Sequence, residues 1–256
     1  MFSNIIEIII LSIVQGISEF LPISSSAHLN IVEIIFEFNS NSLMIDVSLH
    51  LGSLLAIVFY FRRELLDLRN NQKLLSLLII GSIPIVIAGY VISSTGLVNL
   101  LENNLKIIAW TTLIFGIILY LADKSKFDKK ISSNLNFKTI LYIGLFQILA
   151  LIPGVSRAGI TITAARLFRF NRVDSSKISF LLAIPAIAGA SVLQLKNAIG
   201  QSFELNYLVL ISITLSFLFS YFTVKFFLDY INKFSLNVFV IYRIIISIIL
   251  FIIIYN

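Results

Sequence analysis

The most prominent pattern in the chain is a series of long apolar runs, three in each half. A helix needs about 20 mostly apolar residues to cross the hydrocarbon core of a membrane. Each run is long enough to do so. We therefore predict membrane-spanning helices at Leu43–Phe61, Leu74–Ile92, Leu105–Ala122, Ile178–Leu195, Leu205–Leu228 and Leu236–Tyr255.

Two further apolar segments are shorter and are stopped by a proline, at Pro22 and Pro153. A helix usually ends before a proline, because the ring clashes with the preceding turn and lacks an N–H donor. A second short helical stretch follows each break. Broken backbone at membrane depth is tolerated only where it is buried in protein or lines a wet cavity. We predict two re-entrant hairpins, one formed by Ile5–Leu21 with Ser26–Phe38 and the other by Ile140–Ile152 with Ala158–Phe168.

The two halves of the chain echo each other. Pro22–Ser26 (PISSS) matches Pro153–Arg157 (PGVSR), and Leu54–Val58 (LLAIV) matches Leu181–Pro185 (LLAIP) at nearly the same offset. Each half holds one broken hairpin and then three spans, and an odd number of crossings inverts the second half. We predict a single integral membrane domain, residues 1–256, of the all-α polytopic class, with residues 1–128 and 129–256 as inverted-topology repeats.

Composition supports this class and excludes others. Hydrophobic residues make up 58% of the chain, charged residues only 12%, and the mean hydropathy is +0.99. A soluble domain has about 25% charged residues, so both a soluble fold and a disordered chain are excluded. The chain has no cysteine, which rules out disulfides, thiolate metal sites and a cysteine nucleophile. We assign the net charge of +6 to cytoplasmic loops rather than to nucleic-acid binding.

The distribution of Lys and Arg predicts the orientation. Residues 1–61 contain neither, so no cleaved signal peptide is expected. With six spans and two hairpins, most of the cations fall on one side, which the positive-inside rule makes the cytoplasm. The opposite loops, Ser93–Asn104 and Asn197–Glu204, hold no Lys or Arg. The cationic stretches are Arg62–Lys73, Lys124–Lys138, Arg166–Lys177 and Lys225–Lys233.

The first hairpin carries candidate chemistry on both sides of its break. Gln15 and Glu19 are four residues apart and therefore share a helical face. Hydroxyls of Ser24, Ser25 and Ser26 can cap the next helix or act as a nucleophile or ligand. His28 follows within one turn. An ionisable group inside a membrane is functional by default, which applies to Glu19.

The second hairpin reads as an anion site. Gly154 allows close backbone approach, and Ser156 can cap the helix that begins there. Free N–H groups at a helix N-terminus bind anions, and Arg157 beside them can bind phosphate with two parallel hydrogen bonds. Together the hairpins predict a phosphate-handling site for an amphiphile with an anionic head and an apolar tail. We expect span-edge or loop positions for His50, Glu33, Glu37 and Lys196.

These motifs identify a resemblance over nearly the whole chain. Gln15-x-x-x-Glu19, Phe20–Ser25 (FLPISS) with His28, and Pro153–Thr161 (PGVSRAGIT) resemble the undecaprenyl-diphosphate phosphatase family, the bacterial bacitracin-resistance membrane phosphatases. Phe180–Pro185 and Ile241–Arg243 look like further family segments. Gln15 fits the family pattern of Glu or Gln at this position but removes one carboxylate, and the departures are Ala at positions 27 and 158, where Gly and Ser are common, and His50 where a glutamine is expected.

The resemblance implies hydrolysis of undecaprenyl diphosphate to the monophosphate carrier of peptidoglycan synthesis, and hence bacitracin resistance. It also implies a bacterial inner-membrane enzyme that uses Mg²⁺ or Ca²⁺ and opens to the periplasmic side. A homo-oligomer is compatible with the sequence.

For the mechanism, we expect Arg157 and N–H groups near Ser156 to stabilise the transferring phosphoryl group. Glu19, with Gln15 beside it, would hold the cation. Ser25 and His28 would supply the nucleophile and its partner, in either assignment. Contacts to substrate are expected from Gln15, Ser24, Ser26, Gly154, Ser156 and Thr161. The alternative function is a transporter or flippase of polyprenyl phosphates, because inverted repeats with broken helices are typical of transporters.

Overall fold

The computed structural model describes residues 2–36, 43–95, 104–127, 129–199 and 207–255. Within these ranges the regular elements are helices, apart from an isolated bridge between Lys129 and Phe170. In chain order they are α1 (Phe2–Ser18), α2 (Ser25–Phe36), α3 (Leu43–Tyr60), α4 (Arg62–Asp67), α5 (Gln72–Thr95), α7 (Leu105–Asp123), α8 (Ile131–Asn134), α9 (Phe137–Gln147), the 3₁₀ helix η1 (Ile148–Leu151), α10 (Arg157–Leu167), α11 (Arg172–Ile199), α12 (Tyr207–Lys233) and α13 (Asn237–Tyr255).

The six predicted spans are confirmed as helices long and apolar enough to cross a membrane: α3, α5, α7, α11, α12 and α13. Large apolar side chains on these helices face outwards. Along α13, Ile241, Ile245 and Ile252 are 57%, 50% and 54% exposed. Such surfaces need lipid rather than water around them. The chain is therefore a multi-pass membrane protein of the all-α class.

Several helix ends differ from the prediction because polar turns extend the apolar runs. α11 begins at Arg172 rather than Ile178, since the side-chain oxygen of Asn171 accepts a hydrogen bond from the Asp174 amide (2.8 Å) and so starts the helix early. The short helices α4 and α8 lie outside the apolar runs and were not predicted. Apolar length marks the part of a helix that fits a membrane, not the whole helix.

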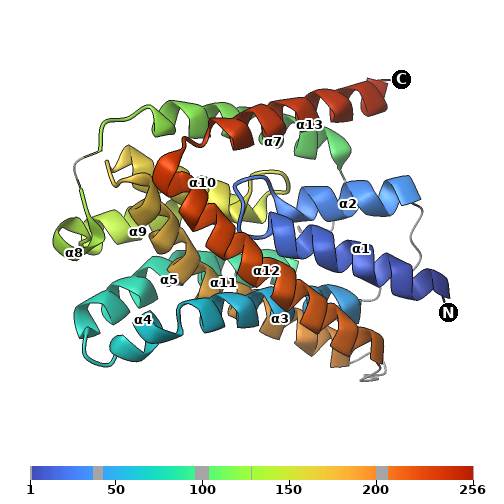
Figure 1. Ribbon diagram of the computed structural model, residues 1–256, viewed down its shortest axis with the longest axis horizontal. Helices are drawn as coiled ribbons and strands as arrows, with labels where there is room; N and C mark the ends of the chain where they lie inside the picture. The colour runs from blue at the N-terminus through green and yellow to red at the C-terminus, as the bar shows by residue number, and fades with distance from the viewer. Residues whose placement is uncertain (1, 37–42, 96–103, 128, 200–206, 256) are drawn as a thin grey trace.

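The two proline-broken segments fold as helix–turn–helix units. α1 packs on α2 across a turn at residues 19–24, and η1 and α9 pack on α10 across a turn at residues 152–156. Figure 1 shows the two turns, blue and yellow, close together near the middle of the molecule. We call them turn 1 and turn 2. The re-entrant position of these units in a membrane stays a prediction.

Packing partners are exchanged between the two halves. α1 packs on α12 and α9 packs on α5, while α3 packs on α11 and α7 on α13. Two repeats related by a two-fold axis would produce these pairings. Ser24 and Ser156 both have left-handed backbones and precede the second helix of their units, and the buried Gln15 and Gln147 stand equally far before them. The repeat, like the single-domain description, stays a prediction.

Small polar residues bring α3 and α12 close together. A Cβ added to Gly52 would lie 2.5 Å from the carbonyl oxygen of Ile213, so a side chain there would force the helices apart. Ser220 donates a hydrogen bond to Ser53 (2.9 Å), and Ser216 donates to the carbonyl of Leu49 (2.6 Å). Close backbone approach and interhelical hydrogen bonds hold helices together where lipid removes the hydrophobic driving force between them.

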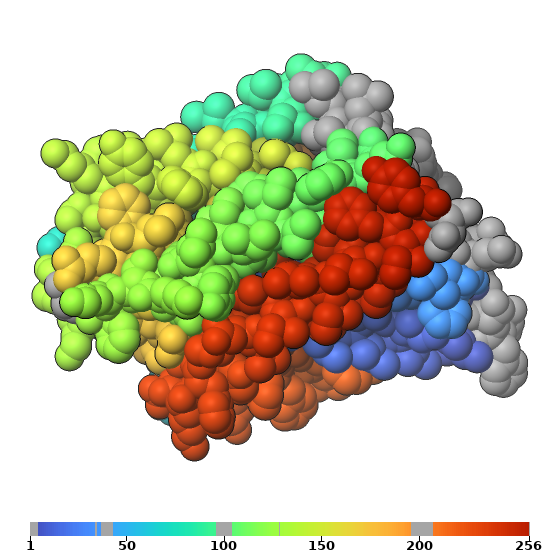
Figure 2. Space-filling model, turned by 90° about the horizontal axis from the view of Figure 1, so that it is seen from above, coloured from blue at the N-terminus to red at the C-terminus, as the bar shows by residue number. Residues whose placement is uncertain are grey.

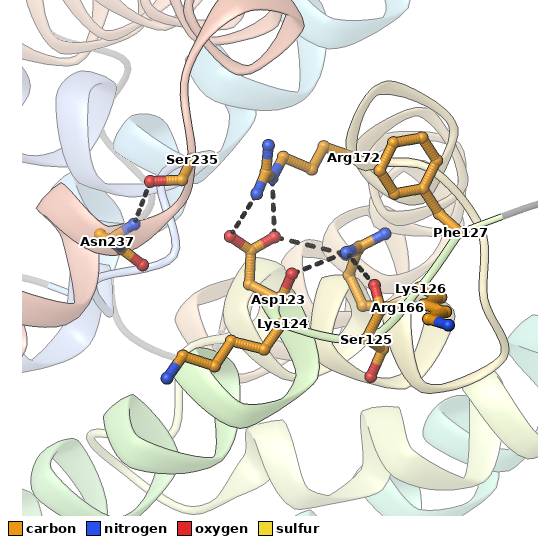
Figure 3. Close-up of a pocket in the computed structure, with 9 residues that line it drawn as sticks. All are labelled: Asp123, Lys124, Ser125, Lys126, Phe127, Arg166, Arg172, Ser235 and Asn237. Carbon is orange, nitrogen blue, oxygen red and sulfur yellow. Dashed lines mark hydrogen bonds and ion pairs between the residues drawn. The ribbon is translucent and has the colours of Figure 1, made fainter.

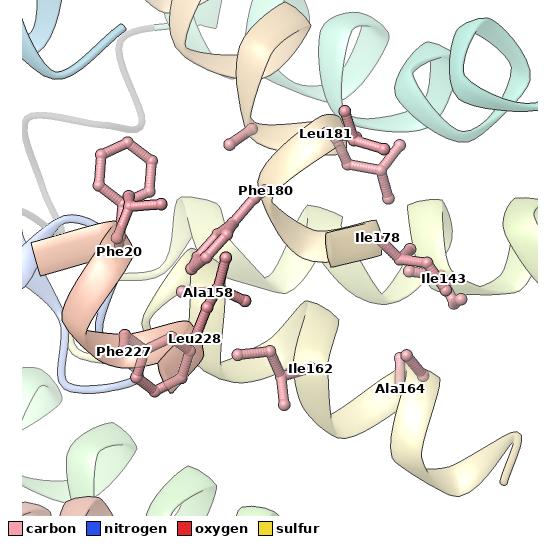
Figure 4. Close-up of a cluster of buried hydrophobic side chains, with 14 of the residues drawn as sticks. Phe20, Ile143, Ala158, Ile162, Ala164, Ile178, Phe180, Leu181, Phe227 and Leu228 are labelled. Atoms are coloured by element: carbon pink, nitrogen blue, oxygen red, sulfur yellow. The ribbon is translucent and has the colours of Figure 1, made fainter. Parts of the chain in front are cut away.

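An aromatic cluster fixes turn 1 against the second half. Phe20 from turn 1 meets Phe180 of α11 edge to face, with ring centroids 5.5 Å apart, and Phe180 contacts Phe227 of α12 at 5.8 Å. Figure 4 shows Ala158 and Ile162 of α10 among the same side chains. Since Phe20 directly follows Glu19, this cluster sets the position of that carboxylate.

Charge is distributed unevenly along the molecule. In Figure 1, α4 and α8 lie at the left, whereas the outer ends of α1 and α13 lie at the right. We call the left end, with residues 62–73, 124–127, 129–138 and 168–172, the basic end. Seen from above, α7 and α13 lie side by side across one face (Figure 2). Much of the two cation-free loops on the opposite side falls outside the described residues.

Candidate active site

Both turns contain residues with unusual backbone conformations. Ser24 in turn 1 and Ser156 in turn 2 have φ values of 78° and 70°, in the left-handed region that side chains disfavour. Gly154 has φ 85°, and a Cβ there would overlap the hydroxyl oxygen of Thr111. Residues held in such conformations cluster at functional sites, where the surrounding structure enforces them.

Arg243 of α13 holds both turns from behind. Its side chain is fully buried, and Nη1 donates to the carbonyls of Pro22 in turn 1 (3.2 Å) and Val155 in turn 2 (3.1 Å). Nη2 donates to the Gly154 carbonyl (2.9 Å) and Nε to the Thr112 carbonyl (3.1 Å). One planar guanidinium thus satisfies carbonyls from three segments, which fixes the separation of the two turns.

Glu19 is the centre of the site. Its Oε2 accepts hydrogen bonds from Ser25 Oγ (2.8 Å) and Gln15 Nε2 (3.0 Å), and its Oε1 pairs with Arg157 Nη2 (3.1 Å). His50 Nδ1 lies 3.8 Å from Oε2. The Glu19 residue is 7% exposed. The buried Glu19 carboxylate therefore links the Ser25 hydroxyl of the first hairpin to the Arg157 guanidinium of the second.

Arg157 opens α10 and crosses to turn 1. Besides the Glu19 carboxylate, its Nη2 donates to the Glu19 carbonyl (3.4 Å), and its Nη1 donates to the Ser179 carbonyl (3.4 Å). The guanidinium carbon lies 5.8 Å from the centre of the Phe20 ring. Its side chain is 13% exposed. A phosphate that reached this edge would offer Arg157 a second anionic partner with matching fork geometry.

Both ring nitrogens of His28 contact groups other than Ser25. Its Nδ1 lies 2.6 Å from the Ser24 carbonyl, and its Nε2 lies 2.6 Å from the Tyr242 hydroxyl, with the two rings stacked. A carbonyl only accepts, so Nδ1 carries the proton and, in the neutral ring, Nε2 accepts from Tyr242. Among the described residues no hydrogen bond joins His28 to Ser25. Its ring therefore ties turn 1 to α13.

The remaining predicted residues line or support the turns. Ser156 caps α10 by accepting a hydrogen bond from the Gly159 amide (3.1 Å), as expected. The fully buried Thr161 hydroxyl donates to Ser179 Oγ (2.6 Å), behind Arg157. Ser24 is buried in turn 1, and Ser26 is exposed, with its hydroxyl 3.4 Å from that of Ser24. Glu19 is thus in direct contact with both Ser25 and Arg157, whereas Thr161 contacts Ser179 behind Arg157.

The expectation for His50 is wrong. It lies within α3, and its Nδ1 is 2.9 Å from Gln15 Nε2, so it belongs to the site. Its position 35 residues from Gln15 gives no local signal. Of the others, Lys196 directly follows the span Arg172–Leu195 within α11, as expected for a span edge, Glu33 lies in α2 rather than in a loop, and Glu37 lies outside the described residues.

The sequence motifs indicate Tyr242 and Arg243 only as part of a family segment, although the sequence also holds a signal for Arg243. It is an arginine inside a predicted span, and such a residue costs about 2.5–3.5 kcal/mol on insertion scales, so the reasoning applied to Arg157 applies equally to it.

Replacing Arg243 with methionine should leave buried carbonyls of both turns without donors. Each orphaned polar group costs about 1–3 kcal/mol, so we expect a large fall in the melting temperature and a loss of activity of about tenfold or more. Melting of the purified protein, followed by intrinsic fluorescence, measures the first effect. Arg63→Met, an exposed position in α4, is the matched control and should melt like the wild type. Equal melting of the two variants would contradict the bridging role of Arg243.

The fold and the site define a polytopic membrane protein with a buried cluster suited to phosphate chemistry. The comparisons then place the chain within a family. Residues 8–249 match the model of the family described as bacitracin resistance protein BacA, and the chain belongs to that family.

Similar proteins are named undecaprenyl-diphosphatase. One from Elusimicrobium minutum is 39% identical over 256 residues, covering 96% of this chain and 97% of that protein. One from Alteromonas mediterranea is 38% identical and covers 94% and 95%. Undecaprenyl-diphosphatase 3 of Bacillus cereus is 38% identical and covers 93% of each chain. The family resemblance predicted from the hairpin motifs is confirmed.

Proposed function

We infer that this chain is an undecaprenyl-diphosphatase, which hydrolyses undecaprenyl diphosphate to undecaprenyl phosphate and inorganic phosphate. This activity returns the lipid carrier to peptidoglycan synthesis and confers resistance to bacitracin. Membership of the BacA family and the names of the similar proteins support it. The observation that carries it structurally is the contact of one buried carboxylate, Glu19, with both the Ser25 hydroxyl and the Arg157 guanidinium.

For the first chemical step, we propose Ser25 as the nucleophile. Its Oγ already donates to Glu19, which accepts the proton as Oγ attacks the terminal phosphorus. The Ser25 O–P bond forms and the bond from that phosphorus to the bridging oxygen breaks, so undecaprenyl phosphate leaves. Arg157 and the N–H groups at the start of α10 stabilise the charge on the phosphoryl oxygens.

The second step reverses the roles of the same groups. Water attacks the phosphoserine phosphorus and gives a proton to Glu19, while the proton that Glu19 held passes to Ser25 Oγ as the O–P bond breaks. Inorganic phosphate leaves and the site returns to its starting state. His28 is the weaker nucleophile candidate, because its Nε2 lone pair is held by the Tyr242 hydroxyl. We assign it the role of positioning turn 1.

The donors around Glu19 fit a divalent cation. The side-chain oxygen of Gln15 is buried and accepts no hydrogen bond from any described residue, and the Nε2 of the same amide donates to the Glu19 carboxylate (3.0 Å). No group of three or more His, Asp or Glu gathers among the described residues. Mg²⁺ commonly uses one or two carboxylates plus substrate phosphates and water, which this donor set allows. Bound here, Mg²⁺ or Ca²⁺ would neutralise charge on the diphosphate.

Orientation is part of the proposal: the basic end faces the cytoplasm and the site opens to the periplasm. Single cysteines are informative because the chain has none of its own. In intact cells, a membrane-impermeant thiol reagent should label Ser94→Cys, at the exposed end of α5, but not Ser132→Cys in α8. Labelling of Ser132→Cys alone would show that the orientation is the reverse of the one proposed. Permeabilised cells, in which both positions must react, provide the control.

Hydrolysis and lipid transport make different predictions for reconstituted protein. Vesicles that contain the protein and undecaprenyl diphosphate should release inorganic phosphate and accumulate the monophosphate, and chelation of divalent cations should stop both. A carrier would move the lipid between leaflets and leave the diphosphate intact. The hydroxyl–carboxylate contact of Ser25 with Glu19 favours hydrolysis, since transport needs charge complementarity but no nucleophile.

A further inference from the structure

A cavity of about 540 Å³ opens at the basic end and shares no lining residue with the site around Glu19. It lies where α7 ends, α13 begins and the α10–α11 connection passes (Figure 3). Four cationic side chains and a single carboxylate line it: Lys124, Lys126, Arg166, Arg172 and Asp123. The proposed reaction leaves this cavity without a role.

The charge inside this cavity is unbalanced. Asp123, with a side chain 3% exposed, pairs with Arg166 Nε (3.3 Å) and also with Arg172 Nε (2.8 Å). In the described part of the chain, no second carboxylate lies within ion-pair distance of either arginine. One buried negative charge therefore faces two guanidinium groups. One carboxylate neutralises only one of the two guanidinium groups, so the surplus positive charge favours an added anion in the cavity.

The two arginines of the cavity have different surroundings. Arg166 is 1% exposed, and its Nη groups donate to the carbonyls of Phe170 (2.6 Å), Asp123 (2.7 Å) and Ser125 (2.9 Å), so it builds the wall. The Arg172 side chain is 29% exposed and uses Nε and Nη2 for Asp123, so its Nη1 has no hydrogen-bond partner among the described residues and is available to a ligand.

Two lysines add further positive charge at the cavity. Lys124 and Lys126 are exposed and line the same cavity. Arginine and lysine together recognise phosphate oxygens through charge-assisted hydrogen bonds.

We propose that this cavity binds a phosphate group, supplied by the headgroup of an anionic phospholipid. Three spans, α7, α11 and α13, end or begin around the cavity. The ends of membrane-spanning helices lie at the depth of the lipid headgroups. Phe127, which lines the cavity, is 58% exposed, and Phe234 and Val238, which adjoin the lining residues Ser235 and Asn237 in the sequence, are 55% and 57% exposed. Basic pockets between membrane helices on the cytoplasmic side bind anionic headgroups, and these exposed apolar side chains suit the acyl chains.

The test measures lipid binding to the purified full-length protein by native mass spectrometry. The probes are dioleoyl phosphatidylglycerol, zwitterionic dioleoyl phosphatidylcholine and inorganic phosphate. The variant is Lys124→Gln/Lys126→Gln, and the matched control is Lys130→Gln/Lys138→Gln, which removes the same charge from exposed positions outside the cavity. Each lysine near an anionic headgroup contributes enough that losing both should weaken phosphatidylglycerol binding roughly thirtyfold. The control should stay within about threefold, as expected for long-range charge alone.

Each outcome decides the proposal. Selective loss of phosphatidylglycerol binding in the cavity variant supports a lipid headgroup site. If inorganic phosphate binds with the same dependence on the two lysines and the lipid does not, the phosphate site stands with free phosphate as its source. Equal losses in the two double variants, or phosphatidylcholine binding as tightly as phosphatidylglycerol, would overturn it. None of these results depends on phosphatase activity.

Discussion

Replacing Arg157 with lysine is expected to lower the rate of phosphate release by about 10²–10³-fold, although the charge is kept. The reason is geometry. Arg157 spans from the Glu19 carboxylate to the Ser179 carbonyl, using both Nη atoms. An ammonium is a compact point charge and cannot copy a planar fork of donors aimed at phosphoryl oxygens. Single-turnover phosphate release at saturating substrate measures the effect on the chemical step.

The control for this variant is Arg63→Lys, the same exchange at an exposed position in α4. It should release phosphate at the wild-type rate. Melting temperatures of both variants establish that they fold. Turnover of Arg157→Lys within a few fold of the wild type would remove Arg157 from the transition state and leave it as a structural partner of Glu19.

Glu19→Gln is expected to lower activity by about 10³–10⁴-fold, because it removes the proton acceptor of Ser25 with almost no change in shape. The amide can still accept one hydrogen bond from Ser25, but it cannot take its proton. It also leaves Arg157 without its carboxylate partner, and breaking a buried pair in this way costs about 3–5 kcal/mol. Activity is measured across a range of Mg²⁺ concentrations, beside the melting temperature.

Gln15→Glu separates the base and cation roles of this region. Gln15 contacts Glu19, and its oxygen is buried and unpaired among the described residues. A second carboxylate there should lower the Mg²⁺ concentration for half-maximal activity while Glu19 remains the base. An unchanged half-saturating concentration would argue that position 15 does not contact the ion. Rescue of Glu19→Gln by excess Mg²⁺ would show that Glu19 acts mainly through the cation.

Apolar run length predicted the six spans well, because a membrane imposes a minimum length on any crossing helix. Proline and glycine predicted the breaks at turns 1 and 2 for equally local reasons. The extra helical turns at the start of α11 were missed, since polar residues outside a membrane leave no apolar signal. The left-handed serines at 24 and 156 were missed too, because tertiary contacts rather than propensity hold them.

The sequence predicted those site residues whose ionisable side chains are costly to place in a membrane, and it missed those that join the site only through tertiary contacts. Glu19 and Arg157 stood out as ionisable groups in apolar surroundings, and they form an ion pair of 3.1 Å. His50 joins the site only because α3 packs on α1, which sequence spacing does not encode. Likewise, sequence left Ser25 and His28 equivalent. Their partners, Glu19 and Tyr242, distinguish the two, and these follow from how the turns are held.

The most direct test of the proposed mechanism compares two neighbouring serines. Ser25 donates to Glu19, whereas Ser26 is exposed and its hydroxyl lies 3.4 Å from Ser24 Oγ. Purified wild-type, Ser25→Ala and Ser26→Ala proteins are mixed with undecaprenyl diphosphate and Mg²⁺, and the inorganic phosphate and undecaprenyl phosphate formed are quantified. We expect equal amounts of the two products from the wild type and Ser26→Ala, and far slower release from Ser25→Ala. Phosphate release from Ser25→Ala at the wild-type rate, or no phosphate release from the wild type, would contradict the proposed mechanism.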